Sequence, residues 1–256
     1  MQRDSIGGTF TVAAILCVVC SVIVSGAAVG LRPIQQVKKA EFEKKNILLA
    51  AGLIKEGESV SAEQINATYE DNITVELIDL DTGEPAVDSE ITLENYDQRA
   101  ASKDPEKSTE ATGLTSIARR ERYSRVYLIN KDGKTQLVVL PIYGKGLWST
   151  LYGFVAVERD ASDKLNQIAG LTFYSHAETP GLGGEVDNPA WKEKWQGKRV
   201  RNDGGEVQLA VIKGVAKSEF EVDGLSGATI TSNGVTNTIQ YWMSDEGFGK
   251  FLANIE

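Results

Sequence analysis

An uncharged apolar segment near the amino end constrains the fold of this 256-residue chain more than any other feature. Residues 6–31 contain no Asp, Glu, Lys or Arg, and the strongly apolar part covers residues 10–29. About 20 apolar residues are enough to cross a bilayer as a helix, whereas a cleaved signal peptide has an apolar core of only about 7–15 residues. The segment therefore predicts a retained membrane helix at residues 10–31. A cleaved signal remains the alternative, because Ser25-Gly26-Ala27 is an acceptable cleavage site.

The charges around this segment give a prediction of orientation. Arg32, Lys38 and Lys39 follow it, whereas Arg3 is offset by Asp4 before it. Lys and Arg accumulate on the cytoplasmic side of membrane helices. Charge alone therefore predicts that the rest of the chain is cytoplasmic.

The composition excludes several classes of function. The net charge of −9 disfavours nucleic acid as a partner, because phosphate binding requires clustered Lys and Arg. Cys17 and Cys20 both lie in the apolar segment, where we expect them to pack on one face of the helix, and His176 is the single histidine. The remaining chain therefore cannot hold an iron–sulfur cluster or a two-histidine zinc site. We expect no metal site and no catalytic residue of a hydrolase.

The pattern of residues 32–256 predicts an α+β fold. Residues 33–53 favour a helix that continues or leans on the membrane helix, and residues 75–80 favour a strand. Residues 125–130 and 135–140 flank an Asp-Gly turn, which is a strong hairpin signal. We expect further strands at 151–157, 168–174 and 207–212, and a helix at 233–244. Strands joined by hairpins, with the helices set apart, indicate an antiparallel sheet with flanking helices.

Two segments that precede most of these strands are expected to lie at the protein surface. Residues 95–115 are polar and irregular, which is typical of an exposed excursion. The basic cluster of Arg119, Arg120, Arg122 and Arg125 predicts a solvated or partner-facing patch. We therefore divide the chain into residues 1–9, the membrane helix at 10–31, a helical linker with a membrane-distal α/β region at 32–123, and a main domain at 124–256.

Three loops of the main domain are candidates for holding a cofactor. The sequence GKGLWS at 144–149 offers two glycines and the planar Trp148, and HAETPGLG at 176–183 combines polar side chains with a Pro-Gly turn. The sequence DGLSGAT at 223–229 sets small residues before a helix that Thr231 or Ser232 could cap. A phosphate on Thr229 would then lie near free N–H groups. Each loop could equally be an ordinary turn without a ligand.

Together these motifs carry a resemblance to a known family. The membrane helix, HAETPGLG at 176–183 and DGLSGAT at 223–229 resemble the C subunit of the sodium-translocating NADH:quinone oxidoreductases, as does the opening sequence IVSGAAVGLR at 23–32. The similarity extends over nearly the whole chain. It implies an FMN-binding domain in which Thr229 holds flavin mononucleotide (FMN) through a phosphoester bond. It also implies electron relay in a sodium-pumping NADH:ubiquinone oxidoreductase of the bacterial inner membrane, built from six subunits.

The resemblance implies further expectations. A separate periplasmic flavin transferase would attach the FMN, with FAD as donor, so the single-pass chain would have its main domain in the periplasm. We prefer this orientation to the one that charge alone predicts. In the expected site, Thr229 is the attachment residue and Lys213 and the backbone of residues 227–229 hold the phosphate. The full set of expected cofactor-binding residues is Leu147, Trp148, Ser149, His176, Glu178, Thr179, Gly181, Leu182, Gly183, Lys213, Ser226, Gly227, Ala228, Thr229 and Thr231.

Three other functions remain open at the level of the sequence. The G subunit of the Rnf complex shares the motif pair and the relay role, but usually on a shorter chain that lacks an insert like the one at residues 66–115. A flavin-binding module with a regulatory, non-redox role is a second alternative. An anchored structural domain without cofactor is the third.

Overall fold

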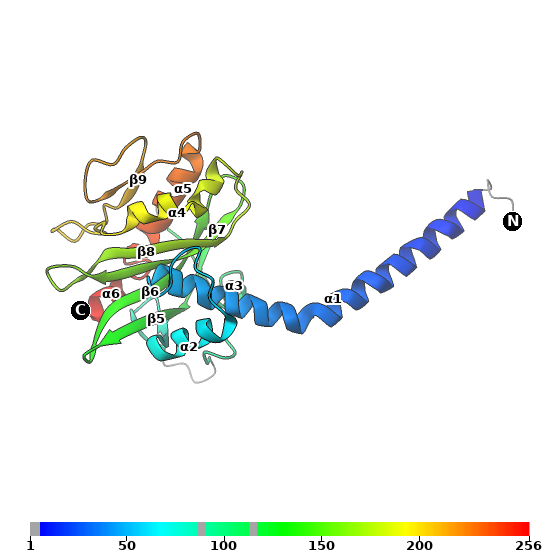
Figure 1. Cartoon of the computed structure of the whole chain (residues 1–256), viewed down its shortest axis with the longest axis horizontal. Helices are drawn as coiled ribbons and strands as arrows, with labels where there is room; N and C mark the ends of the chain where they lie inside the picture. Colours follow the sequence, from blue (N-terminus) through cyan, green and yellow to red (C-terminus); the bar gives the residue numbers. More distant parts are fainter. Residues whose placement is uncertain (1–5, 87–90, 113–116, 256) are drawn as a thin grey trace. The chain divides into compact units, whose positions relative to one another are not determined.

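The structure is a computed structural model that describes residues 6–86, 91–112 and 117–255. The chain forms two compact units, Met1–Glu43 and Lys44–Glu256 (Figure 1). Arg3 and Asp4, on which the charge argument partly depends, lie outside the described residues. So do residues 113–115 of the expected surface excursion.

The first unit consists of most of helix α1, Ile6–Ala50. Among the described residues, α1 is the one helix that is long and apolar enough to cross a membrane, and its most apolar window has a mean hydropathy of 2.7 with nothing buried. Pro33 lies inside the helix without ending it. The helix predicted at residues 33–53 is therefore the continuation of the membrane helix, and it ends at Ala50.

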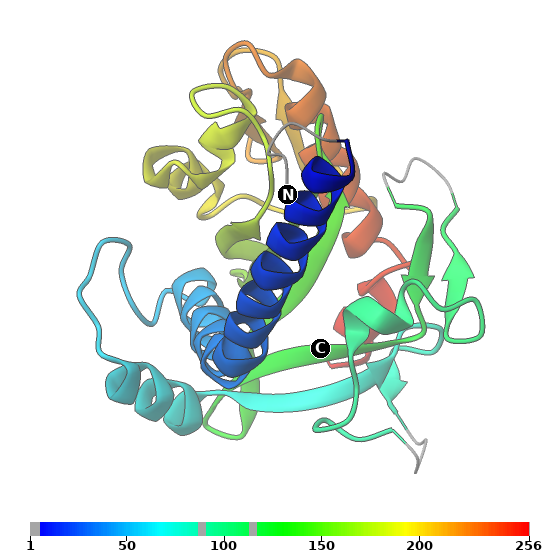
Figure 2. The same cartoon turned by 90° about the vertical axis from the view of Figure 1, so that its right-hand side faces the viewer.

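The second unit is built on a six-stranded sheet in the order β2-β1-β5-β6-β7-β8 (Figure 1; Figure 2). All its pairings are antiparallel, as the sequence predicted. The strands are β1 (Thr74–Asp79), β2 (Glu84–Pro85), β5 (Tyr123–Lys131), β6 (Lys134–Lys145), β7 (Thr150–Arg159) and β8 (Leu165–Ser175).

Local chemistry explains one turn between strands and the starts of two helices. Asp132 and Gly133 both have positive φ, 54° and 77°, which is the geometry of the two-residue turn that suits the twist of a hairpin. Ser61 caps α2 (Ala62–Asn72) in a capping box with Gln64. Asn188 caps the short helix α4 (Pro189–Lys192), whose first residue is proline. The Asp132-Gly133 turn confirms the hairpin predicted between residues 125–130 and 135–140.

The sheet has a hydrophobic core on each face because its side chains alternate. Val138 and Leu140 belong to one core, whereas Val139 between them belongs to the other. The first core is completed by helices α5 (Thr229–Met243) and α6 (Gly249–Asn254) and by the segment around Trp191 and Trp195. The second core contains the carboxyl end of α1, from Ile47 onward, and residues of α2. The sheet is thus buried on both faces.

The expected surface excursion is partly structured. It contains helix α3 (Gln98–Ala101) and strand β3 (Ser108–Glu110), and β3 pairs with β4 (Arg119–Glu121). The arginines that follow form a solvated patch only in part, because Arg122 is exposed while it pairs with Asp79. Arg120 is buried against Asp81, and Arg125 donates hydrogen bonds to the carbonyls of Leu93 and Tyr96. The predicted solvated patch was therefore wrong for Arg120 and Arg125, because their guanidinium groups bind a carboxylate and carbonyls within the protein.

Glu121, the last residue of β4, is fully buried. One of its carboxyl oxygens accepts a hydrogen bond from Gln98 at 2.5 Å. The Tyr143 hydroxyl oxygen lies 2.6 Å from the other and 3.1 Å from the Arg119 carbonyl. A hydroxyl has one proton, so both contacts of Tyr143 can be hydrogen bonds only if Glu121 is protonated. Burial also raises the pKa of Glu121, against the opposing hydrogen bonds from Tyr143 and Gln98 and the charge of Arg120.

We therefore predict that Glu121→Gln stabilises the protein at neutral pH. Because the pKa of Glu121 is higher in the folded than in the unfolded state, its contribution to the free energy of unfolding falls as pH rises from the unfolded value of about 4.3. Glutamine does not titrate, so it removes this loss of stability at higher pH. Its amide keeps the hydrogen bonds with Gln98 and Tyr143. Thermal unfolding from pH 4 to 8 should show the variant gaining on the wild type as pH rises. Glu121→Ala should instead lose roughly 1–3 kcal/mol at pH 4, because it leaves buried partners unpaired, and this deficit should shrink as pH rises because alanine does not titrate either. A constant difference between Glu121→Gln and wild type across this pH range would contradict a neutral Glu121.

Candidate functional site

The first of the three candidate loops connects β6 to β7. A backbone hydrogen bond from Gly146 to the Ser149 carbonyl, 2.8 Å long, closes this hairpin. Leu147 and Trp148 at its tip are exposed, and the Trp148 side chain is 68% accessible. The loop therefore presents a planar aromatic surface to the outside.

The second loop follows β8, and His176 and Glu178 shape its beginning. The His176 ring nitrogen Nε2 lies 2.7 Å from the Asp187 carboxylate, and Nδ1 accepts a hydrogen bond from the Glu178 N–H at 3.2 Å. The Ser149 hydroxyl accepts a hydrogen bond from the Ala177 N–H at 2.7 Å, which joins this loop to the first one. These contacts fix the conformation of the loop around His176. Among the described residues, no hydrogen bond joins His176 to Thr229.

The rest of the second loop is a tight turn. The Thr179 carbonyl accepts hydrogen bonds from Leu182 at 3.1 Å and from Gly184 at 2.9 Å. Gly181 has a φ of 74°, which a glycine adopts without steric cost. The turn leaves Leu182 exposed, and the Leu182 side chain would lie 3.0 Å from a Cβ on Gly227 in the third loop. The second and third loops therefore meet at Leu182.

The third loop leaves strand β10 (Glu221–Asp223), which pairs in parallel with β9 (Ala210–Ile212). Strand β9 is shorter than the one predicted at 207–212. The parallel pairing brings the two carboxyl ends together, so the Lys213 Cα would lie 3.5 Å from a Cβ on Gly224. Lys213 is exposed at this point. The structure thus places a lysine next to the DGLSGAT segment.

Helix α5 begins at Thr229, earlier than predicted. Its cap position is Ala228, and no side chain caps the helix. The expectation that Thr231 or Ser232 caps this helix was wrong, because both lie within it and are buried. Their hydroxyls make hydrogen bonds inside the protein: Thr231 donates to Glu178 at 2.6 Å, and Ser232 accepts from the Leu225 N–H at 3.1 Å. Thr229 itself is exposed at the uncapped amino end.

The carboxylate of Glu178 joins the first loop to α5. It is only 5% exposed, and it accepts hydrogen bonds from the backbone N–H groups of Leu147 at 3.1 Å, Trp148 at 2.9 Å and Ser149 at 3.2 Å. The Thr231 hydroxyl is its fourth donor. Burial opposes ionisation of this carboxyl, but the hydrogen bonds from Thr231 and the three N–H groups outweigh burial and lower its pKa. Glu178 is therefore a buried carboxylate in the ionised form.

Exposed apolar side chains gather around Thr229. Outside α1, the large apolar residues that the structure describes as exposed are few, and most of them lie on the three loops and the first turn of α5. They are Leu93, Leu147, Trp148, Leu182, Val215 and Ile230. Ile230 was missed from the sequence, because a single apolar residue at the start of a helix looks like part of the core. Gly146, one of the two glycines singled out in the first loop, leaves room for Glu178, whose Oε1 would lie 2.6 Å from a Cβ at that position.

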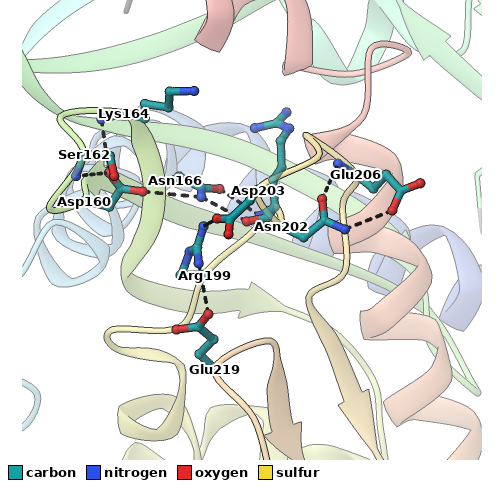
Figure 3. Close-up of polar contacts among 10 residues, drawn as sticks. Asp160, Ser162, Lys164, Asn166, Arg199, Asn202, Asp203, Glu206 and Glu219 are labelled. Carbon is teal, nitrogen blue, oxygen red and sulfur yellow. Dashed lines mark hydrogen bonds and ion pairs between the residues drawn. The ribbon is translucent and has the colours of Figure 1, made fainter.

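A cavity of about 550 Å³ lies elsewhere, beside the turn between β7 and β8. Since β7 has ten residues, this turn is roughly 30 Å along the strand from the Trp148 hairpin. Its polar groups mostly bind one another (Figure 3): Arg199 pairs with Asp203 and Glu219, and Asp160 accepts N–H groups of its own turn. Among the described residues no group of three acidic, His or Cys side chains could hold a metal ion. The candidate site is therefore the one at Thr229.

A comparison with protein families shows the class to which the main domain belongs. Residues 146–244 match the family model of the FMN-binding domain, and this span contains most of the first loop and all of the second and third. The main domain is thus of the FMN-binding class.

The relatives then define the family. The chain is 44% identical to the C subunit of the Na(+)-translocating NADH-quinone reductase of Pseudomonas aeruginosa, over 99% of this chain and 97% of the relative. It is also 44% identical to the corresponding protein of Vibrio alginolyticus, over 99% and 96%. The crystal structure of Shewanella oneidensis NqrC matches with a TM-score of 0.75 and 35% identity, over 85% of this chain and 98% of that one. The chain therefore belongs to the family of C subunits of the Na(+)-translocating NADH-quinone reductases.

Proposed function

We propose that this chain carries one FMN, esterified through its phosphate to Thr229, and relays electrons between other subunits of a sodium-pumping NADH:quinone oxidoreductase. The observation that carries the proposal is the exposed Thr229 hydroxyl at the uncapped start of α5, inside a domain of the FMN-binding family. When bound, FMN supplies reversible electron transfer, which this chain's own side chains cannot provide.

The surroundings of Thr229 fit a phosphate. The first N–H groups of a helix have no partner within it, and the helix dipole favours a negative charge there. Ala228 leaves these groups uncapped by any side chain, and Lys213 offers a cation on the adjacent strand end. The N–H groups of Gly227 and Thr229 and the Lys213 ammonium group would therefore hold the phosphate oxygens, whereas the Ala228 N–H already donates to the Leu225 carbonyl at 3.1 Å.

The surroundings also fit a flavin ring. Trp148, Leu147, Leu182 and Ile230 present apolar surface to the outside, although a soluble domain gains nothing from exposing them. Trp148 and the two leucines would hold the aromatic ring system of FMN, which would cover this apolar surface. These side chains would orient the ring and limit its contact with water, and the flavin would supply the electron exchange.

Burial narrows the choice of attachment residue. The neighbouring hydroxyls of Thr231 and Ser232 are buried and hydrogen-bonded, so an enzyme could not reach them without unfolding the turn. Thr229 and Ser226 are the two exposed hydroxyls of the segment. Thr229 alone stands at the end of the helix, where the phosphate would find unpaired N–H groups, and this position supports the choice of Thr229.

We place the protein in the bacterial inner membrane, spanned once by α1 and with its main domain in the periplasm. Its proposed partners are the other members of an assembly of six subunits that oxidises NADH, reduces ubiquinone and exports sodium. During maturation a periplasmic flavin transferase would bind the domain and transfer FMN from FAD. The names of the relatives, which are subunits of a Na(+)-translocating NADH-quinone reductase, support the assignment to such an assembly.

One experiment tests attachment and orientation together. The full chain is produced in cells that contain the flavin transferase either with or without its export signal, and each product is examined by intact mass and by in-gel flavin fluorescence after denaturation. We expect one esterified FMN per chain with the exported transferase and none with the retained one. Flavin attached by the retained enzyme would place the domain in the cytoplasm. A colourless product in both cases would reject the proposed function.

A further inference from the structure

The Glu178 carboxylate is bound by donors of the chain itself, which a residue that only contacts a ligand would not need. Both of its carboxylate oxygens have two donors each: Oε1 accepts from the N–H groups of Trp148 and Ser149, and Oε2 accepts from the Leu147 N–H and the Thr231 hydroxyl. An ionised carboxylate has about four acceptor positions, and all four are used within the chain. The Glu178 carboxylate therefore has no acceptor position left for a bound molecule.

We propose that Glu178 is the positioning residue of the flavin site, because it fastens the hairpin that carries Trp148 to the helix end that carries Thr229. The proposal rests on the proposed function, since it concerns where the two sides of the flavin site stand relative to each other. The Trp148 N–H binds the carboxylate directly, and Thr229 is two residues before Thr231 on α5. A single side chain thus determines the separation between the proposed attachment point and the proposed ring support.

Two glycines show that the chain is built around this carboxylate. A Cβ on Gly146 would lie 2.6 Å from Oε1, and a Cβ on Gly183 would lie 2.7 Å from Oε2 and 2.6 Å from the Thr231 hydroxyl. Distances this short leave no room for any side chain at either position. The two loops and the helix therefore approach one another as closely as the carboxylate and its donors allow.

The arrangement also explains why an exposed hairpin can be rigid. Trp148 is largely exposed and receives little packing of its own, so its position depends on its backbone. Three consecutive N–H groups on one buried carboxylate fix that backbone, and hydrogen bonds to a charged acceptor are stronger than those between neutral groups. Without the carboxylate, three N–H groups would lose their acceptor at once.

The test uses three substitutions in the full chain. Glu178→Gln places an amide N–H₂ against N–H donors and removes the charge. Thr231→Val keeps the shape of the side chain but removes only the donor on α5, whereas Thr231→Ser keeps that donor. Glu185→Gln is the matched control, because Glu185 lies on the same loop but bonds Asn188 instead of the site.

The first measurement is amide hydrogen exchange at residues 147–149 in protein produced without flavin transferase. We expect these amides to exchange at least about tenfold faster in Glu178→Gln than in wild type, from the loss of charge-assisted hydrogen bonds. Thr231→Val, Thr231→Ser and Glu185→Gln should leave their exchange unchanged. Equal exchange in Glu178→Gln and wild type would overturn the proposal.

The second measurement is the flavin itself, in protein matured with the transferase. We expect Glu178→Gln and Thr231→Val to give a lower fluorescence anisotropy of the attached flavin and a shifted midpoint potential, and Thr231→Ser to restore both. A purely structural role would lower the melting temperature and leave anisotropy and potential unchanged, and that result would also overturn the proposal. If the wild type carries no flavin, the proposed function fails and the positioning role fails with it. Altered exchange with unaltered flavin would reject the positioning role alone.

Discussion

Thr229→Ala protein that matures in the presence of the flavin transferase should contain no covalently bound flavin. The hydroxyl that would form the ester is absent, and the buried Thr231 and Ser232 cannot replace it. The protein should still fold, because Thr229 is exposed and alanine is a good helix former at this position. Its free energy of unfolding should change by no more than about 0.5 kcal/mol. Intact mass and in-gel fluorescence measure the first effect, and thermal unfolding the second.

The neighbouring hydroxyl provides the control for this prediction. Ser226 is the other exposed hydroxyl of the segment, and it lies before the helix instead of at its end. Ser226→Ala should therefore keep the full flavin content. In membranes that contain the whole complex, Thr229→Ala should abolish NADH-driven quinone reduction, whereas Ser226→Ala should not. A fluorescent Thr229→Ala band would move the attachment elsewhere, and loss of fluorescence in Ser226→Ala would point to that serine.

The parts of the fold that were predictable from the sequence depend on local chemistry. The predicted Asp132-Gly133 turn is confirmed by the structure, and the Ser61 cap and the Asn188-Pro189 helix start likewise each depend on residues no more than three positions apart. The continuous apolar run at residues 137–140 of β6 likewise predicts a strand from its own side chains. Such signals require no knowledge of what packs against them.

The features that could not be predicted depend on residues far apart in the chain. Arg120 looks solvated until Asp81, 39 positions earlier, is seen beside it. The start of α5 was misplaced because Thr231 resembles a cap, whereas its hydroxyl is used by Glu178, 53 positions earlier. Glu178 itself looks like a polar loop residue that could touch a ligand. Its role follows only from the contact of two loops with the first turn of α5.

Trp242 should be among the residues whose loss costs most stability. It is fully buried at the far end of α5, its ring contacts Tyr143 and Phe248 at centroid distances of 5.0 and 5.2 Å, and its N–H donates to the Tyr143 carbonyl at 2.8 Å. Trp242→Ala should lower the free energy of unfolding by roughly 3–5 kcal/mol, since it leaves a large cavity. For a domain of this size that corresponds to a melting temperature about 6–20 °C lower.

Trp148 is the matched control, because the same substitution removes the same side chain from an exposed position. Trp148→Ala should change the stability of flavin-free protein by no more than about 0.5 kcal/mol. It should nevertheless lower the anisotropy of an attached flavin, since the ring would lose its proposed support. Trp242→Ala reverses this pattern: it weakens the contact between α5 and β6, and so destabilises the frame on which both Thr229 and the hairpin depend. Equal stability losses in the two variants would show that Trp148 packs in the core in solution, and its proposed contact with the flavin would then have no basis.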